Sequence, residues 1–194
     1  MHIIMLAESE TVKNLWELWS FKATVIATLI TFISAVVTGG FAVWQWRKDL
    51  RWKQAELARI LLDEIFDYDP SNDAWRMVDG EETYKDAQGD QYRIDMAMVR
   101  KALPKPWNDE CAGPDVYVRW CFDALFYYLE RLEQSVQIKL VRVEDLIAPT
   151  SYYIALMAQD KKLFEDYAKL IRFKRALDFM NRFPEWRDKK AETT

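Results

Sequence analysis

The sequence predicts an all-α protein in which a single N-terminal transmembrane helix continues into a cytosolic helical bundle. Three observations predict this fold class. Residues 23–46 are apolar and uncharged, no glycine or proline interrupts the chain between Gly40 and Pro70, and apolar residues recur at helical spacing in most of the remaining chain. With 194 residues and 51% apolar content, the chain can form one domain of ordinary size with an appendage.

The apolar run of residues 23–46 is long enough to span a bilayer, because a helix rises about 1.5 Å per residue. A cleaved signal peptide is disfavoured, since acids such as Glu8, Glu10 and Glu17 replace the basic leading segment. A buried soluble helix is disfavoured by tryptophans at both ends, where membrane interfaces would lie. The residues expected at the two membrane interfaces are Trp16, Trp19, Trp44, Trp46, Arg47, Lys48, Arg51, Trp52 and Lys53.

The cations around the span predict its orientation. Lys13 and Lys22 precede it, whereas the following cations are Arg47, Lys48, Arg51, Lys53 and Arg59. The positive-inside rule therefore predicts a single-pass membrane protein whose C-terminal domain lies in the cytoplasm. Residues 1–22 form a short segment outside, residues 47–186 a cytoplasmic helical domain, and residues 187–194 a polar tail.

Sorting the span by helical phase, at about 100° per residue, separates small side chains from large ones. The small face consists of Thr24, Ala27, Thr28, Thr31, Ser34, Ala35, Thr38, Gly39 and Ala42. The large face consists of Val25, Ile26, Leu29, Ile30, Phe32, Ile33, Val36, Val37 and Phe41. Small residues let helix backbones approach and hydroxyls bond across an interface, so self-association through the small face is the leading interpretation.

Two other interpretations of the small face stay open. Its hydroxyls also suit the wall of a narrow pore between several helices, although no charged residue within the span marks an ion path. A chance pattern is the third interpretation. Dry helix packing is favoured over both, because the ladder of small residues repeats at four-residue steps.

The helix of the span is expected to continue through Leu57, Leu61 and Ile65 and to end before Pro70. Ser71 is a candidate N-cap for a short helix beyond that proline.

Residues 80–93 are polar and contain two glycines, which predicts a loop with a short extended piece. A brief helix over residues 96–103 and a connector from Pro104 to Pro114 come next.

The strongest helix after the span covers residues 115–137. Its apolar seam is Val118, Phe122, Leu125, Leu129, Leu132 and Val136, and its second stripe is Tyr117, Trp120, Cys121, Ala124 and Tyr128. Spacings of three and four residues are typical of a packed seam, so this helix is predicted to be the centre of the bundle, covered on both sides. A ligand-binding role for its aromatic residues is the less favoured alternative.

Helices are also predicted over residues 144–147, 152–159 and 160–183. Pro149 separates the first two, Asp160 is the candidate N-cap of the third, and Pro184 ends it.

The composition offers little for catalysis. His2 is the only histidine, which excludes a histidine-containing triad and a histidine-rich metal site. The five glycines form no phosphate-binding pattern. Cys111 and Cys121 are interpreted as reduced, buried cytosolic thiols. We therefore expect no catalytic residue, no cofactor and no metal.

Two charged clusters have functional alternatives. The acids Asp63, Glu64, Asp67 and Asp69 could bind a metal, but a solvated helix end is favoured. The cations Lys161, Lys162, Lys169, Arg172, Lys174 and Arg175 could bind phosphates or anionic lipids. They alternate with acids and apolar residues, so an ordinary exposed face is favoured there.

The stretches "WQWRKDLRWKQAELARILLDE" and "VRWCFDALFYYLERLE" carry a resemblance. Over residues 20–185 the chain resembles an uncharacterised bacterial family of single-span, membrane-anchored helical proteins, a domain of unknown function. It departs from that pattern at residues 137–139, which lack a glycine turn.

The architecture is also similar to the single-span accessory protein of type VI-B CRISPR systems. That resemblance implies a HEPN-like helical domain and assembly into a pore. HEPN ribonucleases pair an arginine with a histidine in their active site, and His2 alone cannot supply that motif, so a nuclease is not implied.

Two functional hypotheses are compatible with these features. In the first, the protein is a non-enzymatic homo-oligomer in the lipid bilayer whose span self-associates, as a membrane-perturbing or pore-forming effector in antiphage defence. In the second, it is a monomeric tether or adaptor whose cytosolic domain binds a protein or RNA partner.

Overall fold

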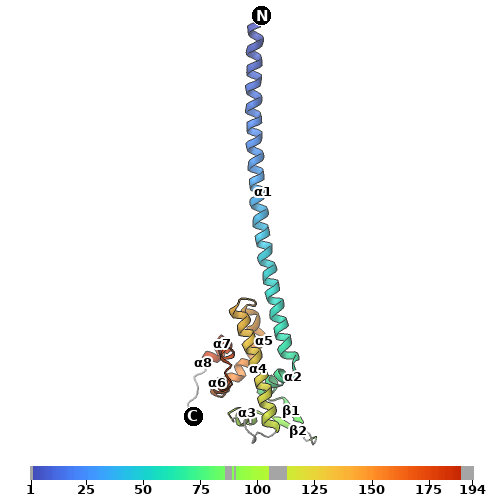
Figure 1. Cartoon of the computed structure of the whole chain (residues 1–194), viewed down its shortest axis with the longest axis vertical. Helices are drawn as coiled ribbons and strands as arrows, with labels where there is room; N and C mark the ends of the chain where they lie inside the picture. Colours follow the sequence, from blue (N-terminus) through green and yellow to red (C-terminus); the bar gives the residue numbers. More distant parts are fainter. Residues whose placement is uncertain (1, 86–88, 90, 105–112, 189–194) are drawn as a thin grey trace. The chain divides into compact units, whose positions relative to one another are not determined.

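The computed structural model describes residues 2–85, 89, 91–104 and 113–188, with side chains from Trp16 onward except at residues 17 and 18 (Figure 1). The chain divides into two units, Met1–Trp52 and Lys53–Thr194. Within the described ranges both units are helical apart from two short strands and their connections, so the predicted all-α class is confirmed.

Helix α1 (His2–Asp67) contains the apolar run, and no break interrupts it. In the first unit every described side chain from Trp19 to Trp52 is exposed. Among the described residues, α1 is the one helix long and apolar enough to cross a membrane. The predicted span is therefore confirmed as a helix of the required length and composition.

The part of α1 that belongs to the second unit is half-buried. Ala58, Leu61, Leu62 and Ile65 recur at three- and four-residue spacing and are at most 8% exposed. The predicted continuation of the helix through Ile65 is confirmed.

Helix α2 (Asp69–Asp79) begins earlier than the sequence suggested. Pro70 occupies its first turn, where a missing N–H costs nothing. Ser71 is therefore inside the helix, and its predicted role as N-cap is wrong. The Ser71 hydroxyl instead donates to the carbonyl of Ile65 at 2.5 Å and lies 3.0 Å from that of Tyr68. The helix ends at Gly80, whose φ of 75° is the left-handed conformation that glycine adopts without strain.

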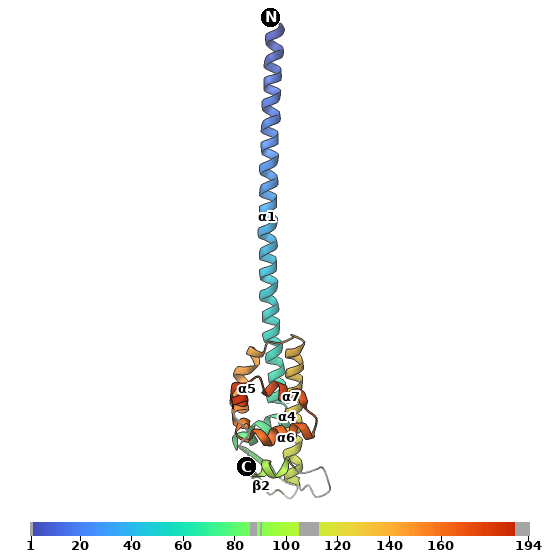
Figure 2. The ribbon, with the colours of Figure 1, turned by 90° about the vertical axis from the view of Figure 1, so that its left-hand side faces the viewer.

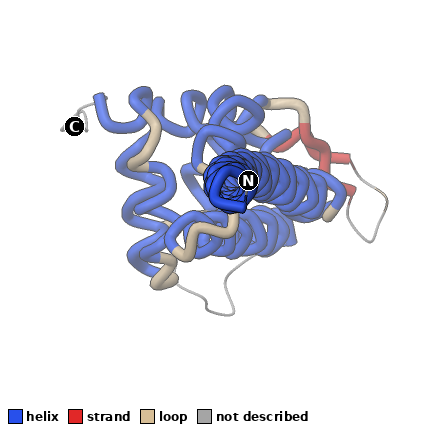
Figure 3. The backbone as a smooth tube through the Cα atoms, turned by 90° about the horizontal axis from the view of Figure 1, so that it is seen from above, coloured by secondary structure: helices blue, strands red, loops and turns tan. Residues whose placement is uncertain are grey.

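Strands β1 (Glu82–Lys85) and β2 (Gln91–Ile94) pair antiparallel, with Glu82 opposite Ile94 (Figure 3). The polar segment thus contains two extended pieces where one was expected. Helix α3 (Met96–Ala102) comes next, capped by the Asp95 carboxylate, which accepts from the Met98 N–H at 2.9 Å. Most of the predicted connector after Pro104 lies outside the described residues, as does Cys111.

Helix α4 (Gly113–Gln137) forms the centre of the second unit. It lies between α2 on one side and α7 on the other, and Figure 2 shows α6 and α7 in front of it. The predicted seam is confirmed up to Leu132, and its last member, Val136, is partly buried. Val118, Phe122, Leu125, Leu129 and Leu132 are at most 1% exposed. The second stripe is only partly covered, since Cys121 is buried but Trp120 is 51% exposed. The prediction of cover on both sides is wrong at Trp120.

Helix α5 (Val143–Met157) passes through Pro149 without a break, so the two helices predicted on either side of it are one. The Thr150 hydroxyl donates to the Leu146 carbonyl at 2.7 Å, and Leu146, Thr150 and Ile154 are all fully buried. Packing of this face offsets the hydrogen bond that the proline cannot make.

The helix predicted over residues 160–183 is instead two shorter helices joined by a turn, and a third helix follows them. After the 3₁₀ turn Ala158–Asp160 come α6 (Lys161–Leu170) and α7 (Lys174–Met180), and α8 (Pro184–Asp188) begins at the proline expected to end the pattern. Arg172 breaks the run with a φ of 65°, while the Phe173 N–H donates to the Ala168 carbonyl at 2.9 Å. This is a Schellman end in which arginine takes the usual place of glycine.

Asp160 is not the side-chain N-cap of α6 that the sequence predicted. Its carboxylate instead accepts two hydrogen bonds from the Arg100 guanidinium, both at 2.8 Å. The Asp160 carboxylate therefore binds an arginine 60 residues away instead of the backbone N–H groups at the start of α6.

Candidate functional site

The small face of α1 is open in the isolated chain. All nine of its residues are exposed, and a Cβ added at Gly39 would meet no atom within 4 Å. The large face is equally uncovered, with side chains that are 41% to 66% exposed from Val25 to Phe41. An apolar surface of this extent is stable only when lipid or another protein covers it.

Three of the four threonine hydroxyls on the small face are satisfied within the helix itself. Thr24, Thr28 and Thr31 each donate to the carbonyl four residues earlier, at 2.9 Å in every case. Because these O–H donors already have acceptors, the face can enter a dry interface without leaving them unpaired. Their oxygens can still accept a bond from a neighbouring helix.

Each end of the span presents an indole beside a lysine. The Lys22 ammonium lies 5.9 Å from the ring centre of Trp19, and the Lys48 ammonium lies 5.6 Å from that of Trp44. Indoles and lysines are the side chains that anchor helix ends at membrane interfaces. The five predicted interface tryptophans are 58% to 76% exposed.

Four predicted interface residues come together on one side of α1. Trp44, Arg47, Lys48 and Arg51 line a surface recess of about 320 Å³. Trp46, Trp52 and Lys53 are exposed but do not line this recess.

A polar cluster in the second unit joins α2, β1 and α4. The Tyr117 hydroxyl donates to Asp73 at 2.7 Å and lies 3.4 Å from Glu82. Arg76 forms an ion pair with Glu82 at 3.1 Å. Burial, and then the charge of Asp73, raise the pKa of the Glu82 carboxyl.

Cys121 borders this cluster as an inert thiol. Burial, followed by the charge of Asp73, raises its pKa to about 12, so the thiolate needed for nucleophilic attack is scarce near neutral pH.

Two further polar contacts fasten α4 to the C-terminal helices. The Tyr167 hydroxyl donates to Asp123 at 2.7 Å, and Arg182 makes two hydrogen bonds to Glu133, both 2.6 Å. Burial raises the pKa of the Tyr167 hydroxyl and of the Asp123 carboxyl. The geometry is that of structural ties between helices, with both partners of each pair engaged.

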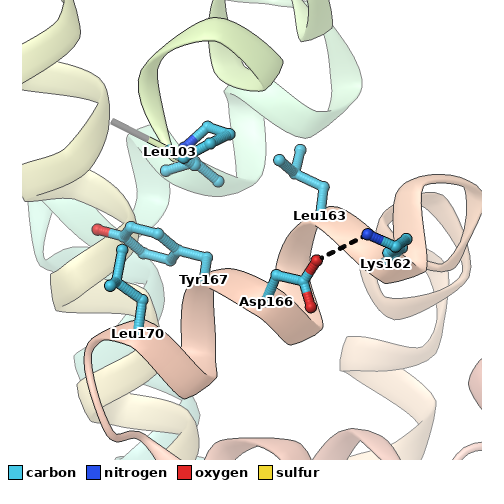
Figure 4. A pocket seen from close by; sticks show the side chains of 7 residues that line it. Leu103, Lys162, Leu163, Asp166, Tyr167 and Leu170 are labelled. Atoms are coloured by element: carbon cyan, nitrogen blue, oxygen red, sulfur yellow. Dashed lines mark hydrogen bonds and ion pairs between the residues drawn. The ribbon is translucent and has the colours of Figure 1, made fainter. Parts of the chain in front are cut away.

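A pocket of about 460 Å³ lies between α3 and α6 (Figure 4). Its lining is Leu103, Pro104, Lys162, Leu163, Asp166, Tyr167 and Leu170. The two charged residues in this lining, Lys162 and Asp166, form an ion pair with each other at 3.1 Å. Tyr167 contributes its ring while its hydroxyl bonds Asp123. Such a pocket can hold an apolar group but offers no set of polar atoms converging on a ligand.

Half of the ten residues in the two charged clusters of the sequence have an ion-pair partner among the described residues. Glu64 bonds Arg131 at 2.7 Å and Asp63 lies 3.6 Å from Arg59. In residues 161–175 the cations Lys161, Lys162 and Lys169 lie within 4 Å of Glu165 or Asp166. No group of three or more possible metal ligands occurs among the residues that the structure describes.

The cluster of Asp73, Glu82 and Tyr117 is absent from the sequence prediction. Its members come from three elements and have no common spacing, and Tyr117 belongs by spacing to an apolar stripe.

Comparison with known proteins found no matching family model, no matching curated protein and no matching solved structure.

Proposed function

We propose that this protein is a non-enzymatic, single-pass protein of the bacterial inner membrane that forms a homo-oligomer through the small face of α1. The observation that supports this proposal most is the two-faced span, whose side chains are exposed on both faces, with small residues on one and large apolar residues on the other. The cytoplasmic location of the second unit is inferred from the cations after the span.

Close packing explains why one face is small. Contact with lipid does not favour small side chains over large apolar ones. Contact between helices does, because small side chains let two helix backbones approach. The open space around Gly39 and the internally bonded threonines support a dry helix–helix contact rather than a water-filled lining.

The output of assembly is proposed from the resemblance to the accessory protein of type VI-B CRISPR systems. It is membrane perturbation, up to pore formation, in antiphage defence. The helical second unit would then receive the signal, as a HEPN-like domain without a catalytic motif. Leakage of a small dye from vesicles that contain the full chain tests this output separately from assembly.

The assembly itself is tested by enlarging the small face. Replacing Ala35 and Gly39 by leucine places bulk where backbones should meet, and overpacking costs about 1–3 kcal/mol per site. The expected result is at least a roughly 10-fold shift toward monomer, measured by chemical crosslinking in membranes and by ultracentrifugation in detergent. The matched control replaces Ile33 and Val37, on the large face, by leucine and should leave assembly unchanged. Equal assembly of both variants would remove the proposal.

A second candidate function is a monomeric membrane tether whose cytosolic domain binds a protein or RNA partner. The observation in its favour is that Lys53–Thr194 is a compact unit with its own buried core. This candidate predicts that a fragment starting at Leu50 keeps full partner binding in solution. A fragment that loses function although it stays folded would favour the assembling span.

A further inference from the structure

Three cations after the span lie on one side of α1, and no described carboxylate pairs with them. Arg47, Lys48 and Arg51 follow Trp44 at intervals of three, four and seven residues, which places all four on one face of a helix. We call this set the cationic face. Its members line a single recess of about 320 Å³, and the Lys48 ammonium lies 5.6 Å from the Trp44 ring centre.

Several arginines of the second unit differ from these three cations, because each has a carboxylate partner. Arg100, Arg131 and Arg182 each bond a carboxylate at 2.6 to 2.8 Å. Among the described residues, no acid pairs with Arg47, Lys48 or Arg51. The acids nearest in sequence, Asp49 and Glu56, lie about 140° and 120° around the helix from Trp44.

Helical phase relates the cationic face to the two faces of the span. At about 100° per residue, the centre of the cationic face lies within about 20° of the centre of the large face and about 160° from that of the small face. Phe41, on the edge of the large face, also packs against Trp44, with ring centres 5.7 Å apart. The side of α1 that would face lipid therefore leads directly into the cations.

We infer that Trp44, Arg47, Lys48 and Arg51 form a binding site for the phosphate headgroup of an anionic phospholipid. This rests on the proposed function, because it takes the large face to be the lipid-facing one. The acyl chains lie along the large face, the indole lies at the interface, and the three cations meet the phosphate oxygens. The small face remains free for the second copy, so lipid binding and assembly occupy opposite sides of α1.

The test compares lipid retention by the full-length protein and two matched triple variants. Each is extracted in mild detergent with equal amounts of phosphatidylglycerol and phosphatidylcholine, and bound lipid is counted by native mass spectrometry. The test variant replaces Arg47, Lys48 and Arg51 by glutamine. The control variant removes the same charge from the second unit, with glutamine at Lys162, Lys169 and Lys174.

The wild-type protein and the control should retain phosphatidylglycerol preferentially, and the test variant should lose that preference by on the order of 100-fold. The single substitution Arg51→Gln should lose about 5-fold, which guards against misfolding of the triple variant. Equal retention by the test variant, or an equal loss in the control, would overturn the inference. Displacement of the lipid by excess inorganic phosphate would show a small-anion site instead and would also overturn it.

Crosslinking of the same samples separates this inference from the proposed function. The test variant should assemble like the wild type, because its substitutions lie opposite the small face. A wild-type protein that assembles but shows no preference for phosphatidylglycerol refutes the lipid site alone. A monomeric wild type that still prefers phosphatidylglycerol refutes the assembly alone.

Discussion

The buried ion pair of Glu133 with Arg182 gives the sharpest stability prediction. Glu133, on α4, is 1% exposed, and both of its carboxylate oxygens accept from the Arg182 guanidinium at 2.6 Å. The pair connects α4 to the turn after α7. Replacing Arg182 by alanine leaves a buried carboxylate without its cation.

The loss of unfolding free energy in Arg182→Ala depends on the groups that still surround the Glu133 carboxylate. Removing one partner of a buried pair costs about 3–5 kcal/mol. Here the Arg182 side chain is 34% exposed, so water partly replaces it, and the Gln137 side chain still donates to Glu133 at 3.0 Å. We therefore expect Arg182→Ala to lower the free energy of unfolding by about 2–3 kcal/mol, or roughly 5–10 °C in Tm.

Calorimetry of the full chain in detergent measures this change. Arg142→Gln is the matched control, because Arg142 pairs with Glu144 at 3.1 Å where both side chains are exposed, and it should cost less than about 0.5 kcal/mol. Glu133→Gln should cost less than Arg182→Ala, since it leaves the cation free to reach water. A cost below about 1 kcal/mol for Arg182→Ala, or the reverse order of the two variants, would refute the reasoning.

Two further predictions concern pH and backbone geometry. The raised pKa of Glu82 means that the folded protein holds this proton more tightly than the unfolded chain, so its contribution to stability is present below pH 4.5 and is lost as pH rises through the folded pKa. Glu82→Gln should flatten that decline in a pH series of urea unfolding curves, and an unchanged slope would contradict it. Arg172→Gly should raise the free energy of unfolding by about 0.5–1 kcal/mol because φ is 65° there, whereas Arg175→Gly, inside α7, should lower it by about 1 kcal/mol; equal signs in urea unfolding would contradict this expectation.

The helical class, the span and the seam of α4 were predictable from the sequence because each depends on local spacing. An uncharged run between tryptophans specifies a membrane-length helix whatever it later contacts. The three- and four-residue spacing from Val118 to Leu132 specifies a buried helix face in the same way, and those residues are at most 1% exposed. The two faces of the span, from which the proposed assembly is argued, are also a property of sequence alone.

Breaks and continuations of helices escaped prediction where tertiary contacts outweighed local preference. Pro149 stays inside α5 because Leu146 and Ile154 are buried on both sides of it. Arg172 adopts a left-handed conformation that sequence patterns assign to glycine, and Lys139 does the same after α4, with a φ of 61°. Lys139 thereby supplies the turn for which residues 137–139 offer no glycine.

The sequence by itself determined which residues are apolar, small or charged along each helix, and therefore which surfaces must be covered. Only the tertiary structure decided which charges find partners, because partners such as Arg100 and Asp160 are 60 residues apart and share no spacing. The same pairing decides which cations stay available: Arg182 is held by a buried carboxylate, whereas Arg47, Lys48 and Arg51 follow a lipid-length helix with no described carboxylate beside them. Burial makes an unpaired charge costly, so the buried Glu133 carboxylate is held by a cation, whereas an exposed cation can stay unpaired in water.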